Sequence, residues 1–188
     1  MALLPILTAP DPRLKKKSLP VEAVDDGVRQ LMDDMLETMY DAPGIGLAAP
    51  QIGVLKRVIV LDIEREDTKT GPLFMANPEI IDASDEDVSY EEGCLSVPEH
   101  YSDVVRPAKV TVRYLDREGK VQELAAEGLL ATCLQHEIDH LDGILFIDHI
   151  SALKRNMILR KLLKARKEQE RDAAHGKPAV AKDPEHAL

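Results

Sequence analysis

The sequence is poor in aromatic residues and cysteine, and it has no long apolar run. It contains no tryptophan, two phenylalanines and four tyrosines in 188 residues, so aliphatic side chains and methionine must form the core. Two cysteines, Cys94 and Cys133, are too few for a disulfide-rich secreted scaffold. No stretch resembles a membrane span, and no basic start marks a signal or transit peptide. We therefore expect a cytoplasmic protein that does not enter membranes, although an organellar location stays open.

Basic residues are scarce in most of the chain. The formal net charge of −10 argues against a protein that coats nucleic acid, and we expect no DNA partner. The charge is uneven, because residues 1–150 carry 14 basic and 29 acidic side chains, whereas residues 151–188 carry 10 and 5. The resulting net charges of −15 and +5 suggest that the C-terminal end has its own partner.

The length and the hydrophobic pattern predict one α+β domain. Apolar residues at helical spacing indicate helices at 24–40, 128–141 and 151–170. Strands are expected at 57–62, within 73–81, at 110–115 and at 120–124. Glycine and proline predict a loop at 43–53, and polar residues predict another at 82–92. The expected architecture has antiparallel strands around a buried central helix at 128–141, in a catalytic domain of residues 1–170. That domain ends in a basic helix, 151–170, and a disordered tail is expected at 171–188.

The predicted central helix carries Gln135-His136-Glu137-Ile138-Asp139-His140, which contains the pattern His-Glu-x-x-His. Residues four apart share one helix face, so His136 and His140 are able to bind one metal ion. Glu137 lies one step around the helix, where it is placed to act on a water beside the metal. The alternative is a chance match between two ordinary histidines.

A catalytic site of this kind needs a third protein ligand. The downstream candidates are Asp148, His149, His175 and His186, of which the last two lie in the predicted tail. Upstream, Cys94 offers a thiolate, which is a strong metal ligand. A lone cysteine is also often a small buried apolar residue, and spacing alone does not decide between these two interpretations.

Three stretches together resemble the peptide deformylase family. They are Gly44-Ile45-Gly46-Leu47-Ala48-Ala49-Pro50-Gln51, Glu92-Gly93-Cys94-Leu95-Ser96 and the His-Glu-x-x-His stretch, in the family's order and spacing. The resemblance implies that the enzyme removes the formyl group from N-formylmethionyl nascent peptides and releases formate. It also implies one divalent metal ion on Cys94, His136 and His140. Fe(II) is the usual ion of the family, and these ligand types also suit Zn, Ni or Co.

The expected chemistry is hydrolysis by metal-bound hydroxide. A metal lowers the pKa of its bound water toward neutrality, and Glu137 serves as general base and then as general acid. The resemblance assigns stabilisation of the oxyanion to the Gln51 side chain and the Leu95 backbone N–H. Without the resemblance, Gln51 would be interpreted as a loop residue that bonds to the backbone.

Helix geometry also suggests a pocket for the methionine side chain. Leu129 and Cys133 precede His136 by seven and three residues and share its face, and Ile45 is a candidate for the opposite wall. Plain core packing is the alternative for Leu129 and Cys133. An extended substrate is expected to pair with the backbone near Gly46 and Gly93.

Two other functions fit parts of the pattern: a metallopeptidase, and a non-catalytic metal-binding or ribosome-associated protein. The basic segment 154–171 suggests a further hypothesis, in which the C-terminal segment 151–188 tethers the enzyme to ribosomal RNA through phosphate contacts. Ile150, Leu153 and Met157 are expected to dock that helix on the domain.

Overall fold

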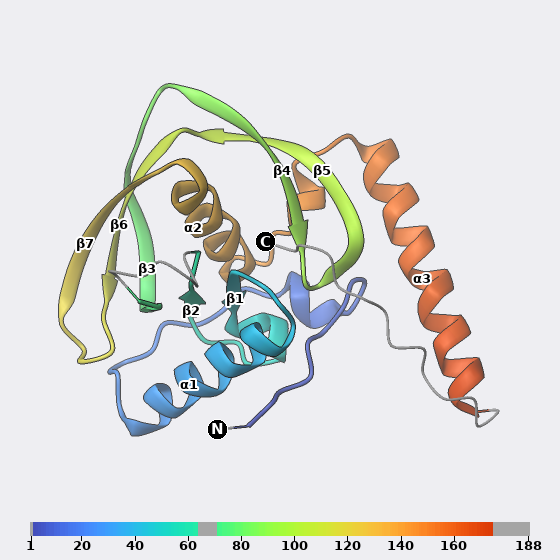
Figure 1. The fold of residues 1–188 in the computed structure, drawn as a ribbon, viewed down its shortest axis with the longest axis horizontal. Helices are drawn as coiled ribbons and strands as arrows, with labels where there is room; N and C mark the ends of the chain where they lie inside the picture. The colour runs from blue at the N-terminus through green and yellow to red at the C-terminus, as the bar shows by residue number, and fades with distance from the viewer. Residues whose placement is uncertain (1, 64–70, 175–188) are drawn as a thin grey trace.

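The computed structural model describes residues 2–63 and 71–174. Strands curve around one central helix, α2, while a second helix, α1, lies along the bottom of the domain and a third, α3, lies at its side (Figure 1). This arrangement confirms the predicted α+β domain with antiparallel strands around a buried helix. Within the described residues, no helix combines the length and hydropathy needed to cross a membrane.

Helix α2, Gly128–Leu141, is the centre of the fold. Ten of its 14 residues are buried, which confirms the prediction of a helix that is enclosed on nearly all sides. Strand β7 leads directly into it, and the left-handed φ of +60° at Gly128 turns the chain from strand to helix. A helix buried this completely holds its side chains in fixed positions, as a metal site requires.

The main sheet has five antiparallel strands in the order β1-β2-β3-β6-β7. Their bounds are Gly46–Ala48, Val58–Leu61, Leu73–Ala83, Lys109–Leu115 and Val121–Glu127. Strand β2 is buried on both faces: Ile59 and Leu61 join the core around α2, whereas Val58 and Val60 join the core around α1. Successive strand residues point to opposite faces, so four consecutive apolar residues separate two apolar cores.

Helix α1, Asp26–Asp41, closes the second core. The Asp25 side chain caps it by accepting a hydrogen bond from the Val28 N–H at 2.8 Å. Its buried apolar residues are Val28, Met32, Met35 and Met39, which recur at helical spacing, and Leu31 packs partly buried beside them.

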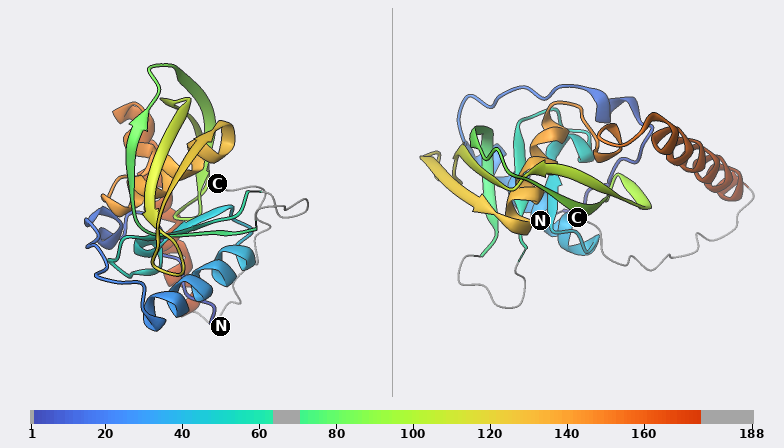
Figure 2. Two further views of the ribbon diagram at one scale, coloured as in Figure 1. Left: turned by 90° about the vertical axis from the view of Figure 1, so that its left-hand side faces the viewer. Right: turned by 90° about the horizontal axis from the view of Figure 1, so that it is seen from above.

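The prediction of a loop at 82–92 is wrong. Strand β4, Asp87–Cys94, pairs with β5, Val97–Pro107, in a long antiparallel ribbon that arches over α2 (Figures 1 and 2). Four of the first five residues of β4 are exposed, so this part lacks the apolar alternation that marks a half-buried strand. Its buried end consists of Glu92, Gly93 and Cys94, and the ribbon thereby delivers these residues to α2.

Two other segments contain regular secondary structure that their glycine and proline content did not indicate. The glycine-rich stretch 43–53 includes β1 and a 3-10 helix, Ala49–Ile52. The Asn77-Pro78 dipeptide, which is typical of a break between strands, is a register shift within the continuous strand β3, where Asn77 adopts a φ of +50°.

Helix α3, Ala152–Ala174, runs along the side of the domain in Figure 1 and extends past the predicted end at 170. The tail beyond it, 175–188, lies outside the described residues. Docking occurs through Ile158, Leu159 and Leu162, which pack in the core cluster that contains Phe146. The expectation that Leu153 and Met157 dock is wrong, because their side chains are 73% and 50% exposed.

Gly143, in the loop after α2, packs against the backbone of the N-terminal segment at Lys15. A Cβ at Gly143 would lie 2.5 Å from the Lys15 carbonyl oxygen, whereas a Cβ at Gly128 would meet nothing within 4 Å. Both glycines have positive φ, so alanine costs about 1–2 kcal/mol at either position. At Gly143 the backbone clash adds about 1–3 kcal/mol. Urea unfolding is therefore expected to show a larger loss of stability for Gly143→Ala than for Gly128→Ala, and equal losses would contradict this packing.

Candidate active site

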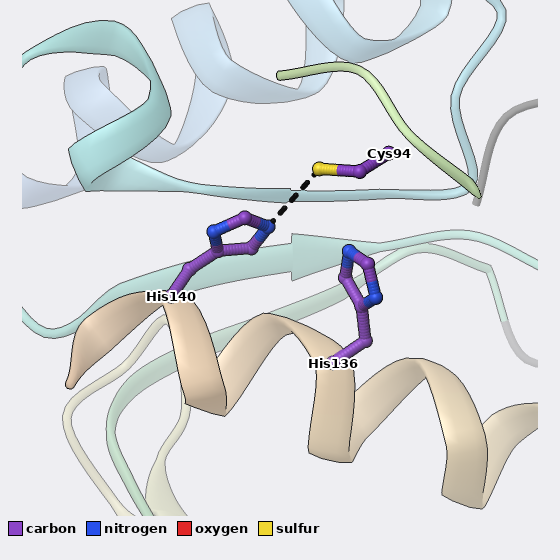
Figure 3. A group of neighbouring side chains, drawn as sticks. All are labelled: Cys94, His136 and His140. Atoms are coloured by element: carbon purple, nitrogen blue, oxygen red, sulfur yellow. Dashed lines mark hydrogen bonds between the residues drawn. The ribbon is translucent and has the colours of Figure 1, made fainter. Parts of the chain in front are cut away.

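Three buried side chains converge where β4 meets α2. Cys94 comes from the end of β4, and His136 and His140 lie one turn apart on α2 (Figure 3). Their ligand atoms lie within 4.8 Å of one another, and the Cys94 Sγ is 3.3 Å from the His140 Nε2. The structure thus brings together the three residues that the sequence suggested as metal ligands.

The donor set fits one divalent cation. His136 Nδ1 is 2.8 Å from a Glu92 carboxylate oxygen, which accepts its ring proton and leaves Nε2 as the atom that would bind a cation. His136 Nε2 is buried and has no hydrogen-bond partner in the described residues, and the same is true of His140 Nδ1 and Glu137 Oε2. Burial lowers the pKa of His140 well below its usual value, which keeps the imidazole in its neutral, ligating form. A thiolate with two imidazoles suits Fe(II), Zn, Ni or Co.

The downstream alternatives are engaged elsewhere. Asp148 pairs with Lys15 and accepts a hydrogen bond from the Leu145 N–H, and His149 Nε2 lies 2.7 Å from Asp139. His175 and His186 lie outside the described residues. Cys94 is therefore the third member of the described cluster.

Glu137 lies beside the cluster but is not part of it. Its side chain is buried, and burial raises its pKa to about 7. A carboxyl group with a pKa near neutrality can both accept and donate a proton, as general acid–base chemistry requires.

Glycines allow the three sequence stretches to approach one another closely. A Cβ at Gly46 would lie 2.5 Å from Glu137 Oε1, and one at Gly44 would lie 2.6 Å from Leu95 Cδ1. The first stretch therefore packs directly against the other two. Gly93 serves the β4–β5 ribbon in the same way, because its missing side chain leaves room for the Tyr101 ring.

Gln51 is buried and held at both ends of its amide. Its Oε1 accepts a hydrogen bond from the Ala48 N–H at 2.7 Å. Its Nε2 donates to Ser96 Oγ at 3.2 Å and lies 3.5 Å from Cys94 Sγ. Gln51 therefore makes the backbone hydrogen bond expected of an ordinary loop residue. At the same time its Nε2 donor is directed toward the cluster.

The residues expected to form the pocket differ in their burial. Cys133 is fully buried, and its Sγ is 4.0 Å from the Ile45 carbonyl oxygen. A Cβ at Gly46 would lie only 3.0 Å from this sulfur, so the glycine allows the close approach. Burial raises the pKa of the Cys133 thiol, so it stays neutral. Leu129, in the first turn of α2, is 39% exposed.

Sequence reasoning missed the partners of Glu92. Arg106 on β5 is 5% exposed and donates to both Glu92 carboxylate oxygens, at 2.5 Å from Nε and 3.0 Å from Nη2. Burial by itself would raise the pKa of Glu92, but the hydrogen bonds from His136 and Arg106 lower it to about 2. Glu92 belongs to the second stretch and so could have been singled out, whereas nothing local marks Arg106.

A buried helix that presents two imidazoles beside a thiolate, with a carboxylate next to them, defines a metal-dependent hydrolase. Comparison with known proteins narrows this class. A model of the polypeptide deformylase family matches residues 3–156. The chain therefore belongs to the polypeptide deformylase family.

Relatives and solved structures agree with this assignment. The chain is 59% identical over 167 residues to a peptide deformylase of Rhizobium meliloti, covering 89% of this chain and 96% of that protein. It is 60% identical over 164 residues to one of Phenylobacterium zucineum, covering 87% and 97%. A crystal structure of a peptide deformylase from Legionella pneumophila has a TM-score of 0.83 at 52% identity, covering 90% and 99%.

The two cysteines provide a matched test of the ligand set. Cys94→Ser should reduce bound metal strongly, because it replaces a soft thiolate with a hydroxyl. Cys133→Ser should keep the metal and mainly alter the use of substrate, since Cys133 lies beside Gly46 and outside the cluster. Metal analysis of anaerobically purified variants checks this, and equal metal loss in both would refute the assignment.

Proposed function

We propose that this enzyme removes the N-terminal formyl group from formylmethionyl nascent peptides in the cytoplasm and releases formate. The observation that carries the proposal is the buried cluster of Cys94, His136 and His140 with Glu137 directly beside it. Family membership supplies the reaction. The metallopeptidase alternative called for a downstream third ligand, and the described candidates for that role make other contacts.

The cation belongs on Cys94, His136 and His140, with Fe(II) as the expected ion and Zn, Ni or Co able to replace it. When bound, it acts as a Lewis acid that polarises the formyl carbonyl and makes water more acidic. Glu137 accepts the proton of the attacking water. As the carbon–nitrogen bond breaks, Glu137 passes that proton to the leaving amine nitrogen, so formate and a free N-terminus result.

Developing negative charge on the formyl oxygen needs preorganised donors. The Gln51 amide is suited to this role because the Ala48 N–H fixes its oxygen and leaves its nitrogen directed toward the cluster. The Leu95 backbone N–H is the second proposed donor. It follows Cys94 in sequence, and the Leu95 side chain packs against Gly44.

We propose that substrate binds along β1. This strand lies at one edge of the five-stranded sheet, where an extended peptide can add as a further strand near Gly46, with Gly93 on the other side. Ile45, Cys133 and Leu129 then form the walls for the methionine side chain. Related enzymes from Ehrlichia chaffeensis and Synechococcus elongatus were crystallised with actinonin, which we expect to compete with substrate here.

Glu137→Gln separates metal binding from catalysis. The variant should keep its metal, because Glu137 is not a ligand, and should lose about 10²–10⁴ in kcat through the loss of proton transfer. Formate release from a formylmethionyl peptide measures this, with the unformylated peptide as a control for peptidase activity. An exposed carboxylate, Glu123, supplies the control variant Glu123→Gln. The role assignment fails if Glu137→Gln loses metal but keeps its activity per bound ion.

We further propose that α3 tethers the enzyme to ribosomal RNA. Basic side chains line this helix, namely Lys154, Arg155, Arg160, Lys161, Lys164, Arg166, Lys167 and Arg171. Most are exposed, and the apolar contacts of the helix with the domain are made by Ile158, Leu159 and Leu162. Phosphate contacts by such residues give salt-sensitive binding.

Charge reversal tests the tether better than truncation near Asn156, which would also remove the docking residues. The triple variant Lys161→Glu, Lys164→Glu, Lys167→Glu changes exposed side chains only. It should abolish salt-sensitive co-sedimentation with ribosomes while the turnover of short formyl-peptides stays unchanged. Binding that survives charge reversal, or that is indifferent to salt, would refute the tether.

A further inference from the structure

Asp139 is an acidic residue of the His-Glu-x-x-His stretch that is neither in the ligand cluster nor beside the reacting groups. Its Oδ2 accepts a hydrogen bond from Arg106 Nη1 at 2.9 Å, and the same oxygen lies 2.7 Å from His149 Nε2. Arg106 in turn holds Glu92, and Glu92 holds His136. A continuous chain of polar contacts therefore runs from the half-exposed His149 to a metal ligand.

The guanidinium of Arg106 is shared between two carboxylates. Its Nε and Nη2 face Glu92, which is fully buried, and its Nη1 faces Asp139, whose side chain is 22% exposed. Three charge-assisted hydrogen bonds fix the plane of this group. The arrangement places two negative charges and one positive charge behind His136.

The sharing determines how strongly Glu92 accepts the hydrogen bond from His136. A cation that is paired with one carboxylate alone withdraws more charge from it than a cation shared by two. Electrostatic effects are stronger in a buried site than in water, so the difference is felt at His136. A stronger acceptor at Nδ1 makes the imidazole a better ligand at Nε2.

We propose that Asp139 is a positioning residue that raises the affinity of the site for its metal by taking up part of the charge of Arg106. His149 supports it by fixing the orientation of the Asp139 carboxylate at the outer end of the chain of contacts. This inference rests on the metal site of the proposed function and deepens it. It concerns metal affinity, and it assigns Asp139 no contact with substrate.

The test compares two isosteric variants on the same helix end. Asp139→Asn removes the charge that shares Arg106. Asp142→Asn is the matched control, because Asp142 also pairs with an arginine, Arg57, at 2.8 Å, and no side-chain polar contact links it to Glu92 among residues 2–63 and 71–174. Co²⁺ affinity is measured for both at one pH by competition with a chelator. Asp139→Asn should weaken cobalt binding by about tenfold or more, the range seen for outer-shell substitutions, and Asp142→Asn should leave it unchanged.

A spectroscopic readout separates this role from a purely structural one. The ring N–H proton of His136 should shift upfield in the NMR spectrum of cobalt-free, zinc-loaded Asp139→Asn, since its hydrogen bond to Glu92 is weaker. A lower melting temperature with unchanged cobalt affinity and an unmoved resonance would overturn the proposal. Wild-type protein that binds cobalt but releases no formate would instead overturn the proposed function and leave this inference standing.

Discussion

The hydrogen bond between Glu92 and His136 is the interaction on which the site depends. It joins the end of the β4–β5 ribbon to the central helix, and these are the two elements that supply the ligands. Glu92 is buried as an anion, so it requires Arg106, and Arg106 ties the second strand of the ribbon to the same point. Breaking a buried pair by removing one partner costs about 3–5 kcal/mol. The geometry of the metal site and the stability of the ribbon are therefore set by the same contacts.

Close backbone packing at two glycines also holds the parts of the site together. Gly44 and Gly46 leave no room for a methyl group between the first stretch and the groups it touches, Leu95 and Glu137. Reactive groups from three separate parts of the chain are thereby held by direct packing. Such packing limits the motion of the Glu137 carboxylate, as its proposed role in proton transfer requires.

Local patterns predicted the parts of the site that lie on one element. The spacing of His136 and His140 fixes their common helix face, and the apolar run before them indicates burial. Cys94 needed the resemblance of three stretches, because its distance to the histidines is a matter of tertiary structure. The ribbon that carries it was missed because an exposed two-stranded ribbon has no apolar alternation. The pairing of Arg106 with Glu92 depends on strand register, which composition does not reveal.

The docking of α3 has a consequence for long-range electrostatics. The last docking residue is Leu162, and the helix continues to Ala174, so its far part reaches about 18 Å beyond the last anchor at 1.5 Å per residue. The Debye length at physiological ionic strength is about 8 Å. The last basic residue of the described helix, Arg171, follows Leu162 by nine residues, so it lies about 14 Å from the anchor point, which is more than one screening length. The described part of α3 therefore carries a local excess of positive charge on a protein whose formal net charge is −10.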